Sequence, residues 1–507
     1  MGRGCGPGRL YPPVDTLSNV AGYHVENFGC RASRSDGESI ASDLRRRGLE
    51  PAPHPAAAHV VIVNTCSVTA EADRQARAWL RRVRRRNPDA RLIVTGCYAQ
   101  RAPQELAALA EVDAVVGNSH KSLVADLAAD FAVRPRSAPD ASMVPLSVLV
   151  DDRFAHAELA SLPFAADARQ TRPNLKVQDG CGNRCSFCII PTTRGPSRSL
   201  PLETCLDNVR RFVEQGGQEL VLSGINLGRW GRDIQPARRL EDLVDAILRR
   251  TSLPRLRLSS IEPMDWTDEL LALCGEFSAE INAEPSLHSA PRILHPRLAR
   301  HAHLPLQSGS DAILRRMHRR YRPWHYAERL AKIRGLLPDA AIGADVMIGF
   351  PGETDALFRE SYDFIAAQPF TYLHLFPFSA RPSTTAWELH RQNPVPAPAV
   401  RERMNALRAL IEEKSRAFRT RFVDRTLSAV TIEPLPGGAT LAMTDNFLKL
   451  ELRGDLPANR MVTAVFTGLA PDGLCGTVEA DSRKDEDPLC PRSTPPGAHP
   501  NGSALLY

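Results

Sequence analysis

The sequence predicts an α/β protein with three parts: an N-terminal open parallel α/β sheet, a central partial (β/α)6 barrel and a small C-terminal antiparallel β-barrel. Three observations predict this fold class. Strand-like and helix-like segments alternate over residues 23–133 and again over 175–379, which is typical of parallel sheets. After residue 421, short runs alternate apolar and polar residues, as antiparallel strands do.

In the first series each expected strand precedes an expected helix. The strands read YHVENFG from residue 23, HVVIVNT from 59, RLIVTG from 91 and DAVVGNS from 113. We expect this domain over residues 20–135, after a loose leader over 1–20. A linker rich in Pro, Ala and Ser follows over 136–170, with room for an edge strand.

The second series supplies a central domain over residues 171–400. Its expected strands are LKVQDG, ELVLSGI, RLRLSSI, HLPLQS, AIGADVMIGF and TYLHLFPFS. Six parallel strands make most of a barrel but fall short of the eight in a closed (β/α)8 barrel. Residues 276–300 read as an insertion before the fourth strand, for which the sequence offers no explanation.

A charged connecting helix is expected over residues 401–420, and the β-barrel over 421–478. The expected barrel strands lie in FVDRTLSAVTIEP, GATLAMTDNFLKLEL (438–452) and MVTAVFTG. A barrel of this size is a common binder of single-stranded nucleic acid. The tail over 479–507 is polar and Pro-rich and is expected to be disordered.

Charge points to a polyanionic partner. The net charge is +6, and basic residues cluster in runs such as RRVRRR at 81–86 and RRMHRRYRPWH at 315–325. The alternative is a set of solvated, Arg-rich helix faces. No apolar run is long enough for a membrane span, and the N-terminus lacks the apolar core of a secretory signal, so we expect a cytoplasmic protein without membrane contact.

Residues 181–188 read CGNRCSFC, which sets Cys181, Cys185 and Cys188 in a C-x3-C-x2-C pattern. The run follows the first strand of the expected barrel, at the end where such barrels place active sites. Three thiolates at this spacing can hold an iron–sulfur cluster and leave one iron open to a small molecule. The alternatives are a zinc site, which usually has four ligands, and three structural thiols.

With Phe187 as the aromatic residue, the pattern C-x3-C-x-aromatic-C resembles the signature of the radical S-adenosylmethionine enzymes. The resemblance implies a [4Fe–4S] cluster whose open iron binds the methionine amine and carboxylate of S-adenosylmethionine. It also implies hydrogen abstraction by a primary alkyl radical. No catalytic residue is therefore expected beyond the clusters.

Cys30, Cys66 and Cys97 occupy one repeated position, because each follows an expected parallel strand and precedes a helix. In an open α/β sheet these strand ends line one crevice, and helix N-termini favour thiolates. Taken singly, each cysteine reads as a small buried residue. Taken together, the three predict a second metal site.

The segments FGCRASRSDGE, NTCSVTAEAD and TGCYAQR resemble the cysteine segments of the methylthiotransferases, with Ser33 where that family often has Asn. The resemblance covers about residues 20–470 and implies a second [4Fe–4S] cluster, which carries the sulfur to be inserted. The runs KVQDGCGNRCSFCIIPTTRGPSRS and HLPLQSGSDAILRRMHRRY look most like the subgroup that acts on N6-threonylcarbamoyladenosine at position 37 of tRNA. The C-terminal strands resemble a TRAM domain, an RNA-binding barrel.

The implied reaction removes the C2 hydrogen of the adenine, joins sulfur to that carbon and adds a methyl group from a second S-adenosylmethionine. The implied partners are tRNA and an electron donor such as flavodoxin or ferredoxin, and a monomer is expected. The alternatives are the same chemistry on isopentenyladenosine-37 of tRNA or on an aspartate of a ribosomal protein. A non-catalytic RNA-binding iron–sulfur protein is an alternative of another class.

Further residues are expected at two surfaces. Strand ends and turns supply candidate cofactor contacts besides Phe187: Gly216, Gly217, Glu219, Ser260, Glu262, Gln307 and Asp345. For the two glycines an ordinary helix-to-strand turn is an equal alternative. Candidate RNA contacts combine charge with one stacking ring, which could equally be core: Arg315, Arg316, Arg319, Arg320, Phe447 and Lys449.

Overall fold

The computed structural model describes residues 21–134, 136, 147–154, 159, 171–278, 281–282 and 293–478. The described chain forms two compact units. The first unit contains the described chain up to Gly29, the segment Asp36–Ser67 and the chain from Glu71 to about residue 154. The second unit takes in the short segments Cys30–Ser35 and Val68–Ala70 and the chain from 159 onward.

The first unit is built on a parallel sheet of six strands in the order β2-β1-β3-β4-β5-β6. The strands are β1 (Gly22–Asn27), β2 (Glu50–Pro51), β3 (Val60–Thr65), β4 (Arg91–Gly96), β5 (Ala114–Gly117) and β6 (Ser147–Leu149). The four strands expected from the sequence are confirmed, and β6 is the edge strand for which the linker had room.

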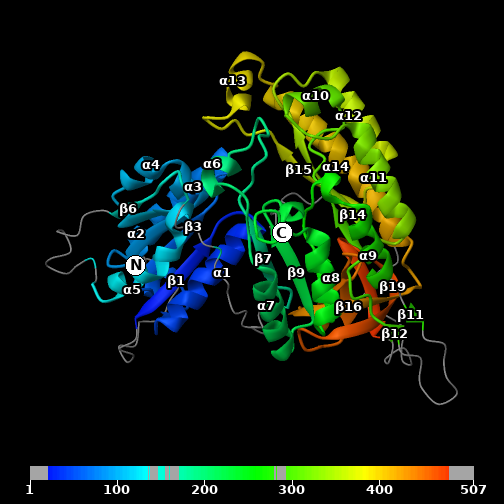
Figure 1. Ribbon diagram of the computed structural model, residues 1–507, viewed down its shortest axis with the longest axis horizontal. Coiled ribbons are helices and arrows are strands. Elements are labelled where there is room, and N and C mark those ends of the chain that lie inside the picture. Colours follow the sequence, from blue (N-terminus) through cyan, green and yellow to red (C-terminus); the bar gives the residue numbers. More distant parts are fainter. Residues whose placement is uncertain are drawn as a thin grey trace, which may run out of the picture. The chain divides into compact units, whose positions relative to one another are not determined.

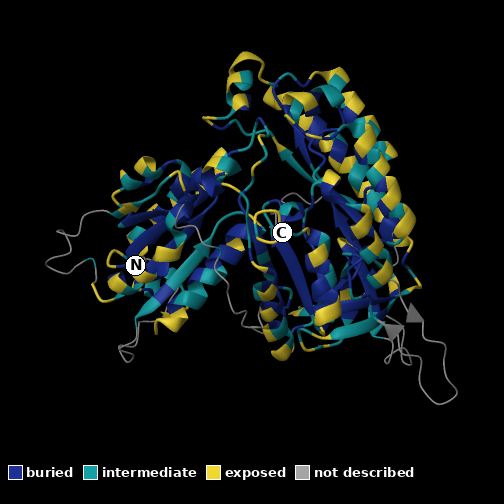
Figure 2. Ribbon diagram, viewed as in Figure 1, coloured by how far each residue is buried: buried dark blue, intermediate teal, exposed yellow. Residues whose placement is uncertain are grey.

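Apolar residues on both faces of the central strands explain the two layers of helix. Val61 and Val63 of β3 pack with α2 (Ala70–Arg86), α3 (Cys97–Arg101) and α4 (Pro103–Ala107). Val60 and Ile62 pack with α1 (Arg31–Arg46) and α5 (Val124–Ala132) on the other face. Strands buried on both faces read as continuous apolar runs, and β3 and β4 are buried along their whole length (Figure 2).

The second unit contains six parallel strands; five lie where the sequence predicted them, and the fourth, expected at HLPLQS, lies at His301–His303. They are β7 (Asn174–Asp179), β9 (Glu219–Gly224), β10 (Arg255–Leu258), β13 (His301–His303), β14 (Ala341–Ile348) and β15 (Tyr372–Pro377). β7, β9 and β10 form one sheet, extended by the short antiparallel strand β8 (Arg198–Ser199), and β13, β14 and β15 form another. A parallel bridge from Leu256 to Leu298 and a hydrogen bond from Ile261 N to His303 O connect the two.

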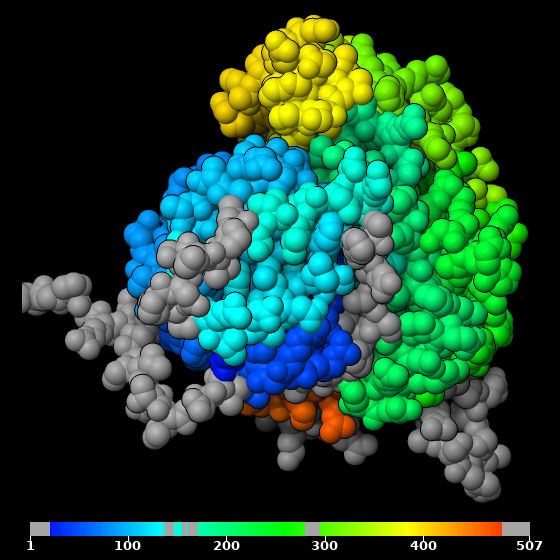
Figure 3. All heavy atoms as spheres, turned by 60° about the vertical axis from the view of Figure 1, so that its left-hand side comes forward, coloured from blue at the N-terminus to red at the C-terminus, as the bar shows by residue number. Residues whose placement is uncertain are grey.

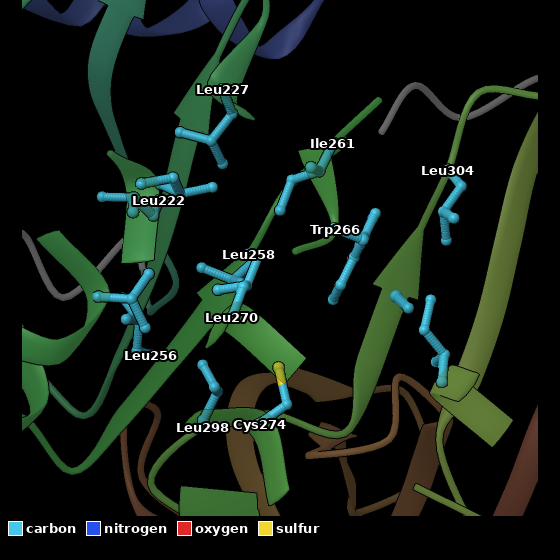
Figure 4. Close-up of a cluster of buried hydrophobic side chains, with 14 of the residues drawn as sticks. Leu222, Leu227, Leu256, Leu258, Ile261, Trp266, Leu270, Cys274, Leu298 and Leu304 are labelled. Atoms are coloured by element: carbon cyan, nitrogen blue, oxygen red, sulfur yellow. The ribbon is translucent and has the colours of Figure 1, made fainter. Parts of the chain in front are cut away.

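Helices cover the outside of these strands (Figure 1). They are α7 (Leu202–Glu214), α8 (Leu240–Arg250), α9 (Asp268–Ser278), α11 (Pro323–Leu336) and α12 (Asp355–Ala367). In Figure 4, Leu256 and Leu258 of β10 meet Trp266, Leu270 and Cys274 in a buried cluster. Burying one such side chain contributes about 1.5–3 kcal/mol, so this core fixes the strands whose ends carry the site.

The C-terminal strands close into a five-stranded barrel, in the order β16-β17-β18-β20-β19. They are β16 (Thr426–Leu435), β17 (Ala439–Thr444), β18 (Lys449–Arg453), β19 (Met461–Ala470) and β20 (Gly473–Val478). The connecting helix is α14 (Ala397–Thr420). The barrel is antiparallel as predicted, except that β18 pairs with β20 in parallel.

Several expectations concern residues that the structure describes only in part. The predicted insertion at 276–300 begins with the end of α9 and carries a short antiparallel pair, β11 (Ile281–Asn282) and β12 (Ile293–Leu294). The leader, most of the linker and the tail lie outside the described residues.

The segment around α13 (Thr385–Gln392) lies at the surface, in yellow in Figure 3. Within the described chain, no helix combines the length and the apolar character that crossing a membrane requires.

Candidate active site

The first cysteine triplet lies on the loop after β7. Gly180 makes the turn into this loop with a φ of 73°, and an added Cβ would lie 1.9 Å from Pro196 O, so glycine is required here. Cys181 N then donates to Gly195 O at 3.0 Å, and Cys188 N donates to Cys185 O at 3.1 Å. These bonds fold the loop back so that all three cysteines line one cavity.

Hydrogen-bond donors reach the sulfur atoms. Cys181 Sγ accepts from Asn183 N at 3.4 Å and from Asn226 Nδ2 at 3.5 Å. Cys185 Sγ accepts from Arg319 Nη1 at 3.3 Å. Donors of this kind orient ligands and tune a metal centre.

The chemistry of the thiols fits a metal cluster. Burial raises the pKa of Cys185 and raises that of Cys188 to about 12, and the charge of a neighbouring cysteine contributes to each. Cys185 and Cys188, whose pKa values are raised in this way, ionise only when positive charge is supplied. Iron supplies that charge in iron–sulfur sites.

The cavity measures about 410 Å³. The structure brings five of the predicted cofactor residues to it, together with the cysteines: Phe187, Ser260, Glu262, Gln307 and Asp345. The end of β9 also lines the cavity, with Ser223, Gly224, Ile225 and Asn226. Sequence reasoning missed this strand end, although ELVLSGIN places polar and small residues just where the strand stops.

Gly216, Gly217 and Glu219 are not brought to the cavity. Gly216 turns the chain after α7 with a φ of 84°, and its N–H donates to Val213 O at 2.8 Å. Glu219 begins β9, whose other end lines the cavity, and it is fully buried against Arg172 and Arg257. The helix-to-strand turn, held as the equal alternative, describes Gly216.

A polar wall completes the cavity, and sequence reasoning missed four of its five members. Register pairs His303 of β13 with Gly343 of β14, Gly343 with Tyr372 of β15, and Asp345 with His374. Side chains on one face alternate with period two, so these residues share the inward face. The wall consists of His301, His303, Asp345, Tyr372 and His374.

Hydrogen bonds hold this wall together. His374 Nδ1 lies 3.1 Å from Asp345 Oδ1, and His303 Nε2 lies 3.5 Å from the same oxygen. Burial raises the pKa of Asp345, but hydrogen bonds from His303 and His374 lower it more, so the carboxylate is ionised. His301 Nε2 lies 2.7 Å from the Tyr372 hydroxyl, and burial, followed by the charge of Arg257, holds the pKa of His301 well below its usual 6.5.

The second cysteine triplet is divided between the units. β3 and β4 pair through Thr65 and Gly96, so Cys66 and Cys97 follow neighbouring strand ends at the same level. Asn118 Nδ2 donates to Cys97 Sγ at 3.5 Å. Cys30 groups with the second unit, where its sulfur lies 3.8 Å from the Ser33 hydroxyl, so the convergence of all three thiols stays a prediction.

The predicted RNA contacts divide into exposed and buried groups. Arg315, Arg316 and Arg320 are exposed near the end of α10 (Asp311–Arg316), whereas Arg319 is buried and faces Cys185. Phe447 and Lys449 line a second cavity of about 250 Å³ beside α14. Phe447 is half-buried, with its ring 4.4 Å from His301 and 5.3 Å from Tyr372 between centroids.

Comparison with known proteins agrees with this geometry. Residues 22–117 match the uncharacterized protein family UPF0004, and residues 175–365 match the radical SAM superfamily. The threonylcarbamoyladenosine tRNA methylthiotransferase MtaB of Aquifex aeolicus is 33% identical over 87% of this chain and 99% of its own. The Bacillus subtilis protein of the same name is 31% identical over 86% and 91%.

Two other similarities widen the comparison. A tRNA-2-methylthio-N(6)-dimethylallyladenosine synthase of Novosphingobium aromaticivorans is 30% identical over 90% of this chain and 96% of its own. Among solved structures, the radical S-adenosylmethionine methyltransferase TsrM of Kitasatospora setae superposes with a TM-score of 0.51. That match covers 74% of this chain and 78% of the other at 14% identity, so it supports the fold alone.

Proposed function

We propose a function from one premise: this chain belongs to the family of radical S-adenosylmethionine methylthiotransferases that modify tRNA. The proposed reaction attaches a methylthio group to C2 of N6-threonylcarbamoyladenosine at position 37 of tRNA. Two relatives whose alignments cover 86–87% of this chain carry threonylcarbamoyladenosine in their names, which supports this substrate. Membership of a tRNA-modifying family argues against the ribosomal-protein and non-catalytic alternatives.

The cysteine loop is proposed to hold the cluster that binds S-adenosylmethionine. Cys181, Cys185 and Cys188 would each bind one iron of a [4Fe–4S] cluster and leave the fourth iron for the methionine group. When bound, this cluster supplies the electron that generates the hydrogen-abstracting radical. The protein's own part is to aim donors at the sulfur atoms, from Asn183, Asn226 and Arg319, and to surround the reacting groups with the cavity wall.

A second [4Fe–4S] cluster is proposed on Cys30, Cys66 and Cys97. The pairing of β3 with β4 supports it, because register sets two of the thiols at the same level of adjacent strands. Polar contacts to these thiols also support it, since Asn118 Nδ2 donates to Cys97 Sγ and the Ser33 hydroxyl lies 3.8 Å from Cys30 Sγ. This cluster would provide the sulfur.

The polar wall is the observation that best supports threonylcarbamoyladenosine as the substrate. A threonylcarbamoyl group presents a carboxylate, a hydroxyl and a urea, which histidine, tyrosine and aspartate side chains can hydrogen-bond. An isopentenyl group is a hydrocarbon and can form no hydrogen bond with these polar side chains. A site built to hydrogen-bond a substrate rejects an analogue that lacks the polar group by as much as about 10⁴–10⁵. The wall formed by His303, Tyr372 and His374 therefore favours threonylcarbamoyladenosine.

Isopentenyladenosine-37 is the second candidate substrate. The similarity to the dimethylallyladenosine synthase of Novosphingobium, at 30% identity over 96% of that protein, favours it. The apolar part of the cavity, which includes Phe187 and Ile190, could contact a hydrocarbon group. The two substrates differ in polarity and can be offered side by side.

The surroundings of the reaction are part of the proposal. Exposed Arg315, Arg316 and Arg320 would contact tRNA phosphates, and Phe447 and Lys449 beside the second cavity would contact the RNA chain. Flavodoxin or ferredoxin would donate electrons. The protein would act as a monomer in the cytoplasm, where its tRNA substrate is found.

The test is anaerobic reconstitution with iron and sulfide, followed by reaction with S-adenosylmethionine, dithionite and anticodon stem–loops. One stem–loop carries threonylcarbamoyladenosine and the other isopentenyladenosine. Mass spectrometry of the nucleosides should show the methylthio form of the first. Cys185→Ala should abolish the product, while Cys205→Ala, which changes a buried cysteine of α7, should retain it. Product on the isopentenyl stem–loop alone would show that the substrate is wrong.

A further inference from the structure

Arg319 differs from the other arginines of its basic run. Arg315, Arg316 and Arg320 are exposed, but Arg319 is only 8% exposed. The backbone explains the difference, because α10 ends and His318 takes a φ of 57°. Arg319 N then donates back to Leu314 O at 2.9 Å, which turns this one side chain inward.

The end of α10 also holds the cysteine loop. Ser186 N donates to Met317 O at 3.1 Å, and the Ser186 hydroxyl donates to Arg316 O at 2.7 Å. His318 Nδ1 lies 3.3 Å from Arg184 O. Carbonyls at a helix end lack partners within the helix, and the loop supplies them here. Cys185 is therefore fixed on both sides by the segment that carries Arg319.

The guanidinium of Arg319 connects three groups. Nη1 donates to Cys185 Sγ at 3.3 Å, Nη2 donates to the Glu262 carboxylate, and Nε donates to the Tyr321 hydroxyl at 3.1 Å. The Tyr321 hydroxyl in turn donates to Leu306 O at 2.7 Å. An arginine guanidinium stays protonated in proteins. A fully charged cation is thus fixed against a sulfur atom.

We propose that Arg319 is a positioning residue that raises the reduction potential of the cluster held by Cys181, Cys185 and Cys188, rather than an RNA contact. The inference rests on the proposed cluster site. Reduction adds one electron from the donor to the cluster, and no bond is formed or broken. The reduced cluster is one unit more negative, so a nearby positive charge and an N–H···S bond stabilise it more than the oxidised form. Burial strengthens the effect by lowering the local dielectric constant.

Substitutions at Glu262 and at Arg319 test the direction of the shift in reduction potential independently. Its carboxylate offsets part of the charge of Arg319, so Glu262→Gln leaves the region more positive. Arg319→Gln leaves it more negative. The two variants should therefore shift the midpoint potential in opposite directions, upward for Glu262→Gln and downward for Arg319→Gln. A purely structural role would loosen the loop in both cases and would not produce opposite signs.

The measurement is a potentiometric titration followed by electron paramagnetic resonance. The full chain carries Cys30→Ala, Cys66→Ala and Cys97→Ala, so that a single cluster contributes to the signal. Arg319→Gln should lower the equilibrium constant for reduction by about tenfold, which is 59 mV for a one-electron couple. Arg319→Lys keeps the charge and should recover part of this loss. Arg211→Gln, on the exposed side of α7, should leave the midpoint unchanged.

Iron content separates failure of this inference from failure of the cluster site. If Cys185→Ala, added to the chain that already carries Cys30→Ala, Cys66→Ala and Cys97→Ala, retains a full cluster of about four irons, the proposed cluster site is wrong. If Arg319→Gln binds its irons and keeps the wild-type midpoint, the cluster site stands and the role of Arg319 is overturned. If Arg319→Gln fails to fold, Arg319→Lys and Glu262→Gln test the inference instead. Unchanged midpoint potentials in both variants overturn it, and an upward shift in Glu262→Gln supports it.

Discussion

At the scale of single residues, Glu219 is a buried carboxylate whose charge is balanced by arginines. Its carboxylate lies 2.7 Å from Arg172 Nε and 2.7 Å from Arg257 Nε, with no exposed surface. Burial raises the pKa of Glu219, but the charges of Arg172 and Arg257 lower it more, so the pKa lies well below its usual 4.5. Glu219 is therefore ionised in the folded protein and acts as a structural counter-ion.

Glu219→Gln should destabilise the fold by about 3–5 kcal/mol, because it leaves buried arginines without their counter-charge. Urea unfolding measures this free energy. Since the folded-state pKa is lowered, the stabilisation is present above pH 4.5 and is lost as the pH falls through the folded-state pKa. The difference between wild type and variant should shrink in that window. Exposed Glu214→Gln, changed in the same way, should stay within about 0.5 kcal/mol of wild type.

Gly343 makes room for the polar wall. A Cβ at this position of β14 would lie 2.0 Å from Tyr372 Cζ, so the tyrosine ring occupies the space that the glycine leaves. Gly343→Ala should destabilise the protein by about 1–3 kcal/mol through overpacking and should displace the Tyr372 hydroxyl from His301. Thermal unfolding measures the loss. Gly335→Ala, in helix α11 with nothing within 4 Å, is the matched control and should be neutral or stabilising.

At the scale of elements, two arginines attach the C-terminal barrel to the central strands. Arg257 of β10 donates to Thr444 O at 2.9 Å and to Asp445 O at 3.0 Å. Arg300, just before β13, donates to Asp445 Oδ1 at 3.1 Å. The turn between β17 and β18 is thus held by β10 and by the residue that precedes β13, one of the three strands of the polar wall.

Asp445→Asn should weaken this junction by about 3–5 kcal/mol, since it removes the buried partner of Arg300. Calorimetry of the full chain should show a lower unfolding temperature. Asp455→Asn, in an exposed loop of the same barrel, removes the same charge and should have little effect. Equal effects from both substitutions would assign the loss to net charge rather than to the junction.

The sequence predicts an element well where its apolar pattern is strong. β3, β4 and β14 are apolar runs, and each lies where the pattern placed it. β13 was expected at HLPLQS but lies at His301–His303, because its inward residues are polar and give no apolar signal. β20 was missed because GLCGTV is short and holds two glycines. The run 438–452 breaks into two strands at Phe447, whose φ of 64° a hydropathy pattern cannot reveal.

The site residues also divide into those that a local sequence pattern reveals and those that it does not. The cysteines and the strand-end residues Ser260, Glu262 and Gln307 were predictable because spacing and strand direction place them at one end of a barrel. The burial of Arg319 could not be predicted, because a basic run does not show which of its members turns inward. The polar wall was missed because it depends on the register of three strands that are distant in sequence.

At the scale of the whole molecule, the chain forms two compact units with separate hydrophobic cores. Cys181, Cys185 and Cys188 lie in the second unit, as does Cys30, whereas Cys66 and Cys97 lie in the first. A domain with its own core can remain folded when a site in another unit is lost. The two proposed clusters should therefore be separable by mutation.

We expect about eight irons per reconstituted chain, and about four in Cys66→Ala and in Cys185→Ala. The two variants should differ in chemistry. Cys66→Ala should still cleave S-adenosylmethionine and release deoxyadenosine, because the loop after β7 is intact, but should add no sulfur to tRNA. Cys185→Ala should lose both activities. Iron assay, deoxyadenosine release and nucleoside mass spectrometry measure the three quantities on one preparation. If Cys66→Ala also stops deoxyadenosine release while its irons near Cys185 remain, the clusters are not independent, and the division of labour between the two units is wrong.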